Sequence, residues 1–343
     1  MRSIGASAFA YCYGLENVQI GNNVTTLGRS AFWYCGLKSI IIPDSVKSIG
    51  IQAFGDCGLE SITIPDGVTS IGDAAFGSCT SLASITIGNG VTSIGYDAFR
   101  NCTSLTSMTI PDSVTSIGNR TFYNCNSLTK ITIPDSVTSI GEAAFYGCTS
   151  LTSITIPDSV TSIGKSAFTG CTSLTSITIP DGVTSIGDQA FLSCTSLTSI
   201  TIGNGVTSIG DAAFGSCTNL TSFIFKGDAP TVAQLAFSGV ADGAVAYVTR
   251  EALSSFGDSG DNWNGLSIKL RDGNTDPAPL PEIRTAIEFS FDAVNGVSYR
   301  IEASTDLINW EMIETAIIGE GSRIDRFYST RDQPNRHFRV KTN

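Results

Sequence analysis

One stretch of the sequence reads Leu151-Thr-Ser-Ile154-Thr-Ile156-Pro157-Asp158-Ser-Val160-Thr-Ser-Ile163-Gly164-Lys-Ser-Ala167-Phe168-Thr-Gly-Cys171. Apolar residues alternate with threonine around Ile154 and Ile156, which predicts a strand. Pro157-Asp158 ends that strand and turns the chain. Val160–Ile163 then predicts a second short extended piece, and after Gly164 the residues Ala167–Cys171 suit a single helical or 3₁₀ turn. The stretch therefore contains two short strands and two changes of direction.

The same pattern recurs along the chain with a fixed period. Successive cysteines are 22 or 23 residues apart, and one phenylalanine and one leucine recur with them. A period of this length is typical of a repeat array. A unit so short cannot bury its own apolar face, so neighbouring units must stack on one another as a solenoid. The ten cysteines are Cys12, Cys35, Cys57, Cys79, Cys102, Cys125, Cys148, Cys171, Cys194 and Cys217.

The consensus L-x-x-I-x-I-P-x-x-V-x-x-I-G-x-x-A-F-x-x-C resembles the BspA-like, or treponemal-type, leucine-rich repeat over residues 1 to about 240. That resemblance implies a curved solenoid of 23-residue units, with a parallel β-sheet and short helical turns. It also implies adhesion or protein binding by secreted or surface-attached proteins of bacteria and some protists.

Changes in composition predict the domain boundaries. We expect a leucine-rich repeat solenoid over 1–222, its C-terminal cap over 223–270, a linker over 271–282, and a small antiparallel β-module over 283–343. The last segment is similar to C-terminal modules on secreted proteins of Verrucomicrobia-type bacteria. Met1-Arg2-Ser3-Ile4-Gly5 matches Val-Thr-Ser-Ile-Gly of later units. We therefore expect a fragment truncated at its N-terminus, from an extracellular or cell-surface protein.

Composition argues against several classes of function. The net charge is −11 and charged residues make up 15% of the chain, whereas a protein that tracks nucleic-acid phosphates needs a basic stripe. No apolar run approaches the roughly 18 residues of a membrane span. Gly164-Lys165-Ser166 lacks the earlier glycine of a phosphate-binding loop, because position 159 is serine. With a single histidine in the chain, the sequence predicts neither an enzyme nor a cofactor or metal site.

Two rows of residues that could bind metal ions or react, the cysteines and a set of aspartates, are explained by structural roles. The cysteines occupy one interior position of each unit, where a free thiol packs as a small hydrophobe. Their oxidation state stays open, since neighbouring sulfurs could bond where the units approach closely enough. A row of aspartates ends successive strands and suits turns, with a weak calcium ladder as the alternative. The row comprises Asp112, Asp135, Asp158 and Asp181.

The candidate contact residues for a protein or glycan partner form two groups. The first is an outward threonine row on the strands, represented by Thr109, Thr132, Thr155 and Thr178. The second consists of residues that depart from the consensus and fall mostly in the turns. These are Tyr96, Arg100, Arg120, Tyr123, Lys130, Tyr146 and Lys165.

Two functions remain open from the sequence. The first is a non-catalytic surface or secreted binding protein. The second is a structural or self-associating envelope or filament element, because an uncapped solenoid end exposes strand edges that can pair weakly with another copy. Light scattering at high concentration distinguishes them, since a monomer disfavours end-to-end stacking.

Overall fold

The computed structural model describes residues 2–271 continuously and, after them, the backbone of five strands. The chain forms two compact units, Met1–Asn274 and Thr275–Asn343. The predicted linker over 271–282 lies outside the described residues except for Arg271. The interpretation of 223–270 as a cap stays a prediction.

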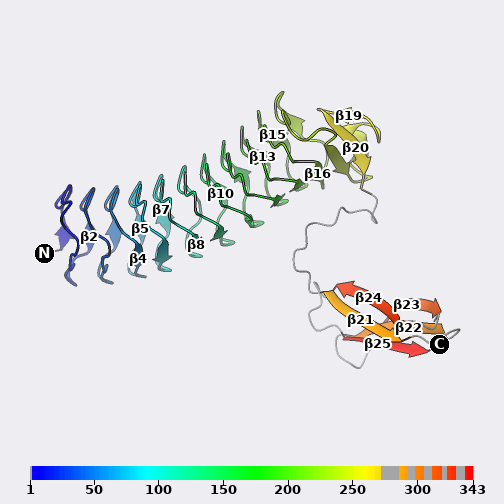
Figure 1. Ribbon diagram of the computed structural model, residues 1–343, viewed down its shortest axis with the longest axis horizontal. Coiled ribbons are helices and arrows are strands. Elements are labelled where there is room, and N and C mark those ends of the chain that lie inside the picture. Colours follow the sequence, from blue (N-terminus) through cyan, green and yellow to red (C-terminus); the bar gives the residue numbers. More distant parts are fainter. Residues whose placement is uncertain are drawn as a thin grey trace. The chain divides into compact units, whose positions relative to one another are not determined.

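The first unit is a solenoid whose turns follow one another in a row (Figure 1). Most turns contribute a two-residue strand to one side, where Ser139 pairs with Ser162 and Ser162 with Ser185, all in parallel. The turn of Ile117 contributes only an isolated bridge to Ile140. One sheet joins β1 (Ser3–Ile4), β2 (Thr26–Leu27), β3 (Ser48–Ile49), β5 (Ser70–Ile71) and β7 (Ser93–Ile94). A second joins β10 (Ser139–Ile140), β11 (Ser162–Ile163), β13 (Ser185–Ile186), β15 (Ser208–Ile209) and β17 (Thr231–Val232).

A second side of the solenoid carries longer strands. In several units the strand precedes a proline-aspartate turn, and in others it precedes glycine-asparagine. One sheet joins β4 (Ser61–Ile64), β6 (Ser84–Ile87), β8 (Ser107–Thr109) and β9 (Lys130–Thr132). Another joins β12 (Ser176–Ile179), β14 (Ser199–Ile202), β16 (Ser222–Phe225), β18 (Val245–Val248), β20 (Leu266–Leu270) and β19 (Asn262–Trp263). The two sheets are separate because no backbone hydrogen bond of residues 153–156 reaches a neighbouring turn in the described solenoid. The predicted strand around Ile154 is therefore not formed as a regular strand.

The predicted stacking of units around one apolar interior is confirmed. The repeated leucine, isoleucine, valine, alanine, phenylalanine and cysteine side chains form a single buried cluster. Phe145 is fully buried, and its ring lies 5.3 Å from the ring of Phe122 on one side and 5.3 Å from that of Phe168 on the other. The same parallel stacking runs from Phe9 to Phe237.

The predicted helical turn before each cysteine is wrong. Ser166 and Gly170 have φ values of 55° and 73°, and left-handed residues interrupt a right-handed helix. Alternate backbone N–H groups of this segment donate hydrogen bonds to the next turn. The N–H of Phe168, for example, donates to the carbonyl of Ala190 at 2.7 Å. We call this segment, Lys165–Cys171 in the quoted unit, the arc. In the described part of the chain the only helix is α1 (Leu253–Phe256).

Close approach between turns requires glycine at the start of the arc. A Cβ atom on Gly164 would lie 2.6 Å from the backbone carbonyl carbon of Gly141. Gly187 in the next unit meets the backbone of Lys165 at the same distance. Any side chain here would therefore push neighbouring turns apart.

An aromatic cluster packs the C-terminal end of the solenoid. Trp263 on β19 contacts Phe225, Phe237 and Phe256, with ring centroids 4.8–5.8 Å apart. β19 pairs antiparallel with β20, whereas β20 extends the sheet in parallel beside β18. Trp263 and Phe256 thus pack over the last turns of the stack.

The second unit contains antiparallel strands. β21 (Ala286–Asp292) pairs with β24 (Arg323–Ser329). β22 (Ser298–Ser304) lies between β23 (Glu311–Ile318) and β25 (His337–Thr342). Asn295-Gly296, a dipeptide typical of hairpin turns, lies outside the described residues, and the strands that flank it belong to different sheets.

Candidate functional site: the hydroxyl face

The row of outward threonines lies on the side of the solenoid that carries the longer strands. Burial alternates along these strands, so in β12 the isoleucines are buried while Thr178 is exposed. Thr109, Thr132 and Thr155 are exposed in the same way, as predicted. We call this surface the hydroxyl face. It is defined by Thr63, Thr86, Thr109, Thr132, Thr155, Thr178 and the neighbouring Ser61, Ser84, Ser107, Ser153, Ser176 and Ser199.

Hydrogen bonding distinguishes these threonines from those on the other strands. On the side of the two-residue strands, the Thr138 hydroxyl donates to the carbonyl of Thr115 in the preceding turn at 3.2 Å. Thr161 donates in the same way to Thr138. Within residues 2–271, the Thr132 hydroxyl and its counterparts in the row have no protein partner. The hydroxyl face therefore retains hydrogen-bonding groups that a ligand can use.

This difference predicts unequal effects of one substitution at two sites. Thr138→Val removes an inter-turn hydrogen bond and should lower the free energy of unfolding by about 0.5–1 kcal/mol. Thr132→Val removes no protein hydrogen bond, so we expect a change within about 0.5 kcal/mol. Urea denaturation of the two variants tests this, and equal losses of stability would contradict the assignment.

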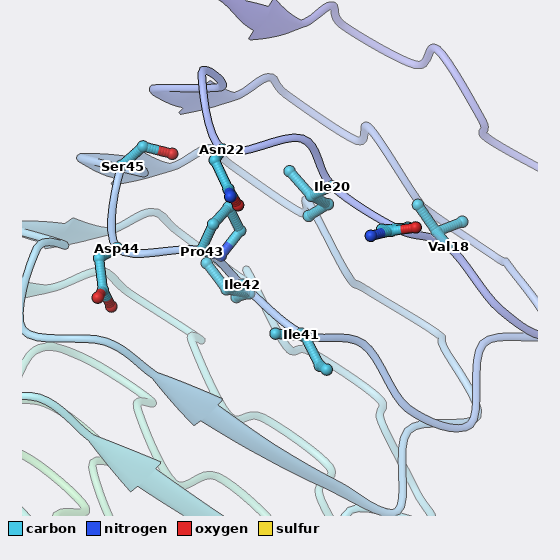
Figure 2. Close-up of a pocket in the computed structure, with 9 residues that line it drawn as sticks. Val18, Ile20, Asn22, Ile41, Ile42, Pro43, Asp44 and Ser45 are labelled. Atoms are coloured by element: carbon cyan, nitrogen blue, oxygen red, sulfur yellow. The ribbon is translucent and has the colours of Figure 1, made fainter.

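A hollow of about 650 Å³ interrupts the face at its N-terminal end. Figure 2 shows its lining side chains on two neighbouring segments, Val18–Asn22 and Ile41–Ser45. Ile41 is 84% exposed and occupies the position that threonine holds in later units. Asp44 is also exposed and forms no ion pair in residues 2–271.

A second hollow, of about 520 Å³, continues the first. It shares Ile41, Ile42 and Asp44 with the first hollow, and extends to Thr63 and Thr86 on the next two turns. Together the two hollows form a groove across the first four turns, with an exposed isoleucine at its centre. Sequence reasoning missed this site, although Ile40-Ile41-Ile42 breaks the alternation and would have shown it.

The structure separates the sequence-predicted contact residues onto two surfaces. Lys130 lies on β9 beside Thr132, and is exposed on the hydroxyl face. The other variable residues lie in arcs of different turns, where Arg100 and Lys165 are exposed and Tyr96 is 57% exposed. The structure thus does not bring these residues together with the threonine row.

Two contacts on the arc side are local. The Arg120 guanidinium donates to the Asp97 carboxylate of the preceding turn, with a nitrogen–oxygen distance of 3.0 Å. Tyr123 and Tyr146 are half-buried and stack at 4.7 Å between ring centroids. Both contacts join consecutive turns, which gives Arg120, Tyr123 and Tyr146 a structural role.

The aspartates at the ends of the strands also connect turns. The Asp181 carboxylate accepts a hydrogen bond from the backbone N–H of Asn204 at 3.1 Å, and that of Asp66 accepts one from Asn89 at 2.8 Å. In the described part of the chain, no group of three or more His, Cys, Asp or Glu side chains is placed to hold a metal ion. Asp181 and Asp66 therefore accept hydrogen bonds from the backbone of the next turn.

The cysteines are free thiols, and all except the half-buried Cys12 are buried. The Cys148 thiol donates to the carbonyl of Phe122 in the preceding unit at 3.2 Å, and the other buried thiols repeat this bond. Burial raises the pKa of Cys125 and of Cys171 to about 12. Reactive thiols need a lowered pKa and exposure, so these thiols are structural.

Known proteins similar to this chain carry the same architecture. A family model described as a BspA type leucine-rich repeat region (6 copies) matches residues 2–128 and 115–242. A leucine-rich repeat protein from Bacteroides ovatus is similar over 79% of this chain and 82% of its own, with 28% identity and a TM-score of 0.53. A Treponema pallidum leucine-rich repeat protein is 32% identical over 47% of this chain and 78% of its own, with a TM-score of 0.45. No curated protein sequence matches the chain significantly.

Proposed function

The chain belongs to the BspA-type leucine-rich repeat family, and from this we propose that it is a non-catalytic, secreted or surface-attached binding protein whose hydroxyl face holds a protein partner around Ile41. Leucine-rich repeat proteins generally bind other proteins, and their repeat fold is typically non-catalytic. No helix in the described residues has the length and apolar character needed to cross a membrane.

The observation that carries the proposal is the groove around Ile41. A large aliphatic side chain that is 84% exposed contributes little burial energy to the free protein. Removing it from water against a partner is favourable. Unpartnered hydroxyl groups around it can then satisfy polar groups of the partner. An apolar centre with a polar rim is the usual arrangement of a protein-binding surface.

The test is a solid-phase binding assay on a plate-coated panel of extracellular matrix proteins. We expect saturable binding to at least one of them, weakened about tenfold or more by Ile41→Asp. Leu235→Asp is the matched control, because Leu235 is 50% exposed and lies in a late turn; it should leave binding unchanged. Equal affinity of both variants, or binding by neither variant nor native protein, would reject the proposal.

A further inference from the structure

Exposed apolar side chains are concentrated in the first turns of the solenoid. Of eight large hydrophobic side chains that are exposed in residues 2–271, all except Tyr96 and Leu235 lie between Phe9 and Ile51. Tyr11, Tyr13 and Tyr34 are among them, with 51%, 68% and 40% of their surface exposed. These tyrosines lie on the arc side, and the groove around Ile41 includes none of them.

The three tyrosines form one cluster with the half-buried Trp33. The Tyr11 ring lies 5.8 Å from that of Tyr34 and 4.9 Å from that of Trp33, and 6.2 Å from that of Tyr13. Tyr11 and Tyr34 are nearly parallel at 14°, whereas Trp33 is inclined to them by 58° and 68°. We call these four residues the aromatic corner.

The next turn of the solenoid holds the aromatic corner in place. The indole N–H of Trp33 donates to the Asp56 carboxylate at 3.0 Å. Gly55 leaves room for the indole, because a Cβ atom there would lie 3.2 Å from Trp33 Cδ1. Trp33 and Tyr34 are thus fixed between a turn on each side, and Tyr34 still exposes a large part of its ring.

The electrostatics of the aromatic corner disfavour an anionic ligand. The negative charge of Asp56 is the main cause that raises the pKa of Tyr34. The phenol therefore stays a neutral hydrogen-bond donor, and Asp56 repels anions. A cation can pack on a single ring face, but the phenols and the carboxylate together can bond to the many hydroxyl groups of a sugar.

We propose that the aromatic corner of Tyr11, Tyr13, Trp33 and Tyr34, together with Asp56, binds a neutral oligosaccharide. The C–H faces of a pyranose ring pack against aromatic rings, and its hydroxyl groups bond to phenols and to a carboxylate. The exposed parts of the tyrosine rings form the surface on which such a sugar packs. Tyrosine and tryptophan also lose little side-chain entropy on binding. This site is independent of the protein-binding groove around Ile41.

Affinity gel electrophoresis of the full chain tests the proposal, with soluble galactomannan, mixed-linkage β-glucan and xylan as probes. We expect at least one polysaccharide to retard the native protein, and Tyr34→Ala to weaken that interaction tenfold or more. The matched control is Tyr146→Ala, which removes a stacked, half-buried arc tyrosine far along the stack. It should leave the retardation unchanged.

Three outcomes would overturn the proposal: no retardation by any probe, equal weakening by both tyrosine variants, or loss of matrix-protein binding in Tyr34→Ala without any polysaccharide binding. Ile41→Asp separates the two sites, because it should weaken protein binding about tenfold or more and keep polysaccharide retardation.

Trp33→Phe gives an independent readout. If the sugar contacts the indole, this substitution should remove the change in tryptophan fluorescence on binding while the fold, measured by circular dichroism, is kept.

Discussion

Raising the pH from about 8 to about 11 is expected to unfold the solenoid under reducing conditions at a temperature where it is stable at neutral pH. Burial raises the pKa of Cys57, Cys125 and Cys171 to about 12. The pKa is raised in five other cysteines as well, namely Cys35, Cys79, Cys102, Cys148 and Cys194. In the unfolded chain each thiol returns to the ordinary value near 9.

The direction of the effect follows from proton linkage. Between pH 9 and 12 the unfolded chain releases thiol protons that the folded chain keeps, so the free energy of unfolding falls as pH rises. Below pH 9 both states are protonated and the contribution is fully present. Each thiol contributes roughly 1.4 kcal/mol per pH unit in this window. For the three thiols with pKa values about 12, the loss between pH 9 and pH 11 is roughly 7 kcal/mol, because the unfolded thiols reach the full slope only above pH 9. This is comparable to the whole stability of a typical domain.

Chemical denaturation at several pH values between 8 and 11 measures this slope. Cys171→Ala is the informative variant, because it lacks one titrating thiol. It should reduce the dependence of the free energy of unfolding on pH by the contribution of one thiol. Its stability at pH 7 should be lower, since it loses the bond from the thiol to the Phe145 carbonyl. A native protein whose stability does not change between pH 8 and 11, or a variant with an unchanged slope, would show that the thiols do not titrate as their burial requires.

Phe145→Ala is expected to lower the free energy of unfolding by about 3–5 kcal/mol. Its ring is fully buried between two others at 5.3 Å, and the neighbouring turns cannot close over the void because their backbones are hydrogen-bonded to one another. Dispersion contacts on both faces of the ring are lost together with its hydrophobic transfer energy.

Phe9→Ala is the control for that experiment. Phe9 stacks on Phe32 on one side only and is 36% exposed, so its removal should cost clearly less. Urea unfolding monitored by far-UV circular dichroism gives both values. Similar losses for the two variants would show that the stacked rings are not what stabilises the centre of the array.

The repeat period made the solenoid predictable, because burial of Phe168, Cys171 and their counterparts is possible only between stacked units. Residue types alone could not decide whether the arc is helical. The backbone of Ser166 adopts a left-handed conformation while its N–H donates to the carbonyl of Asp188 in the next turn. This long-range contact outweighs the local preference of serine for a negative φ. The outward direction of Thr132 and Thr178 followed from strict alternation, and the structure agrees.

The candidate sites were less predictable than the fold. Attention to departures from the consensus selected Tyr123 and Arg120, which bond to neighbouring turns, and passed over Ile41, whose exposure depends on the turns beside it. The aromatic corner depends on Gly55, which admits Trp33 from the previous turn. Contacts between residues one unit apart become visible only when the register of the units is known.

The glycine at the start of each arc has a consequence for how such a chain changes length over generations. Most units meet the one before them through the same close backbone approach, 2.6 Å for a Cβ on Gly164 and again on Gly187. A whole unit of this kind that is duplicated or deleted therefore creates a junction like those already present. Unequal recombination between near-identical coding segments can thus lengthen or shorten the protein by one turn at a time, whereas an insertion of a few residues would misalign the glycine.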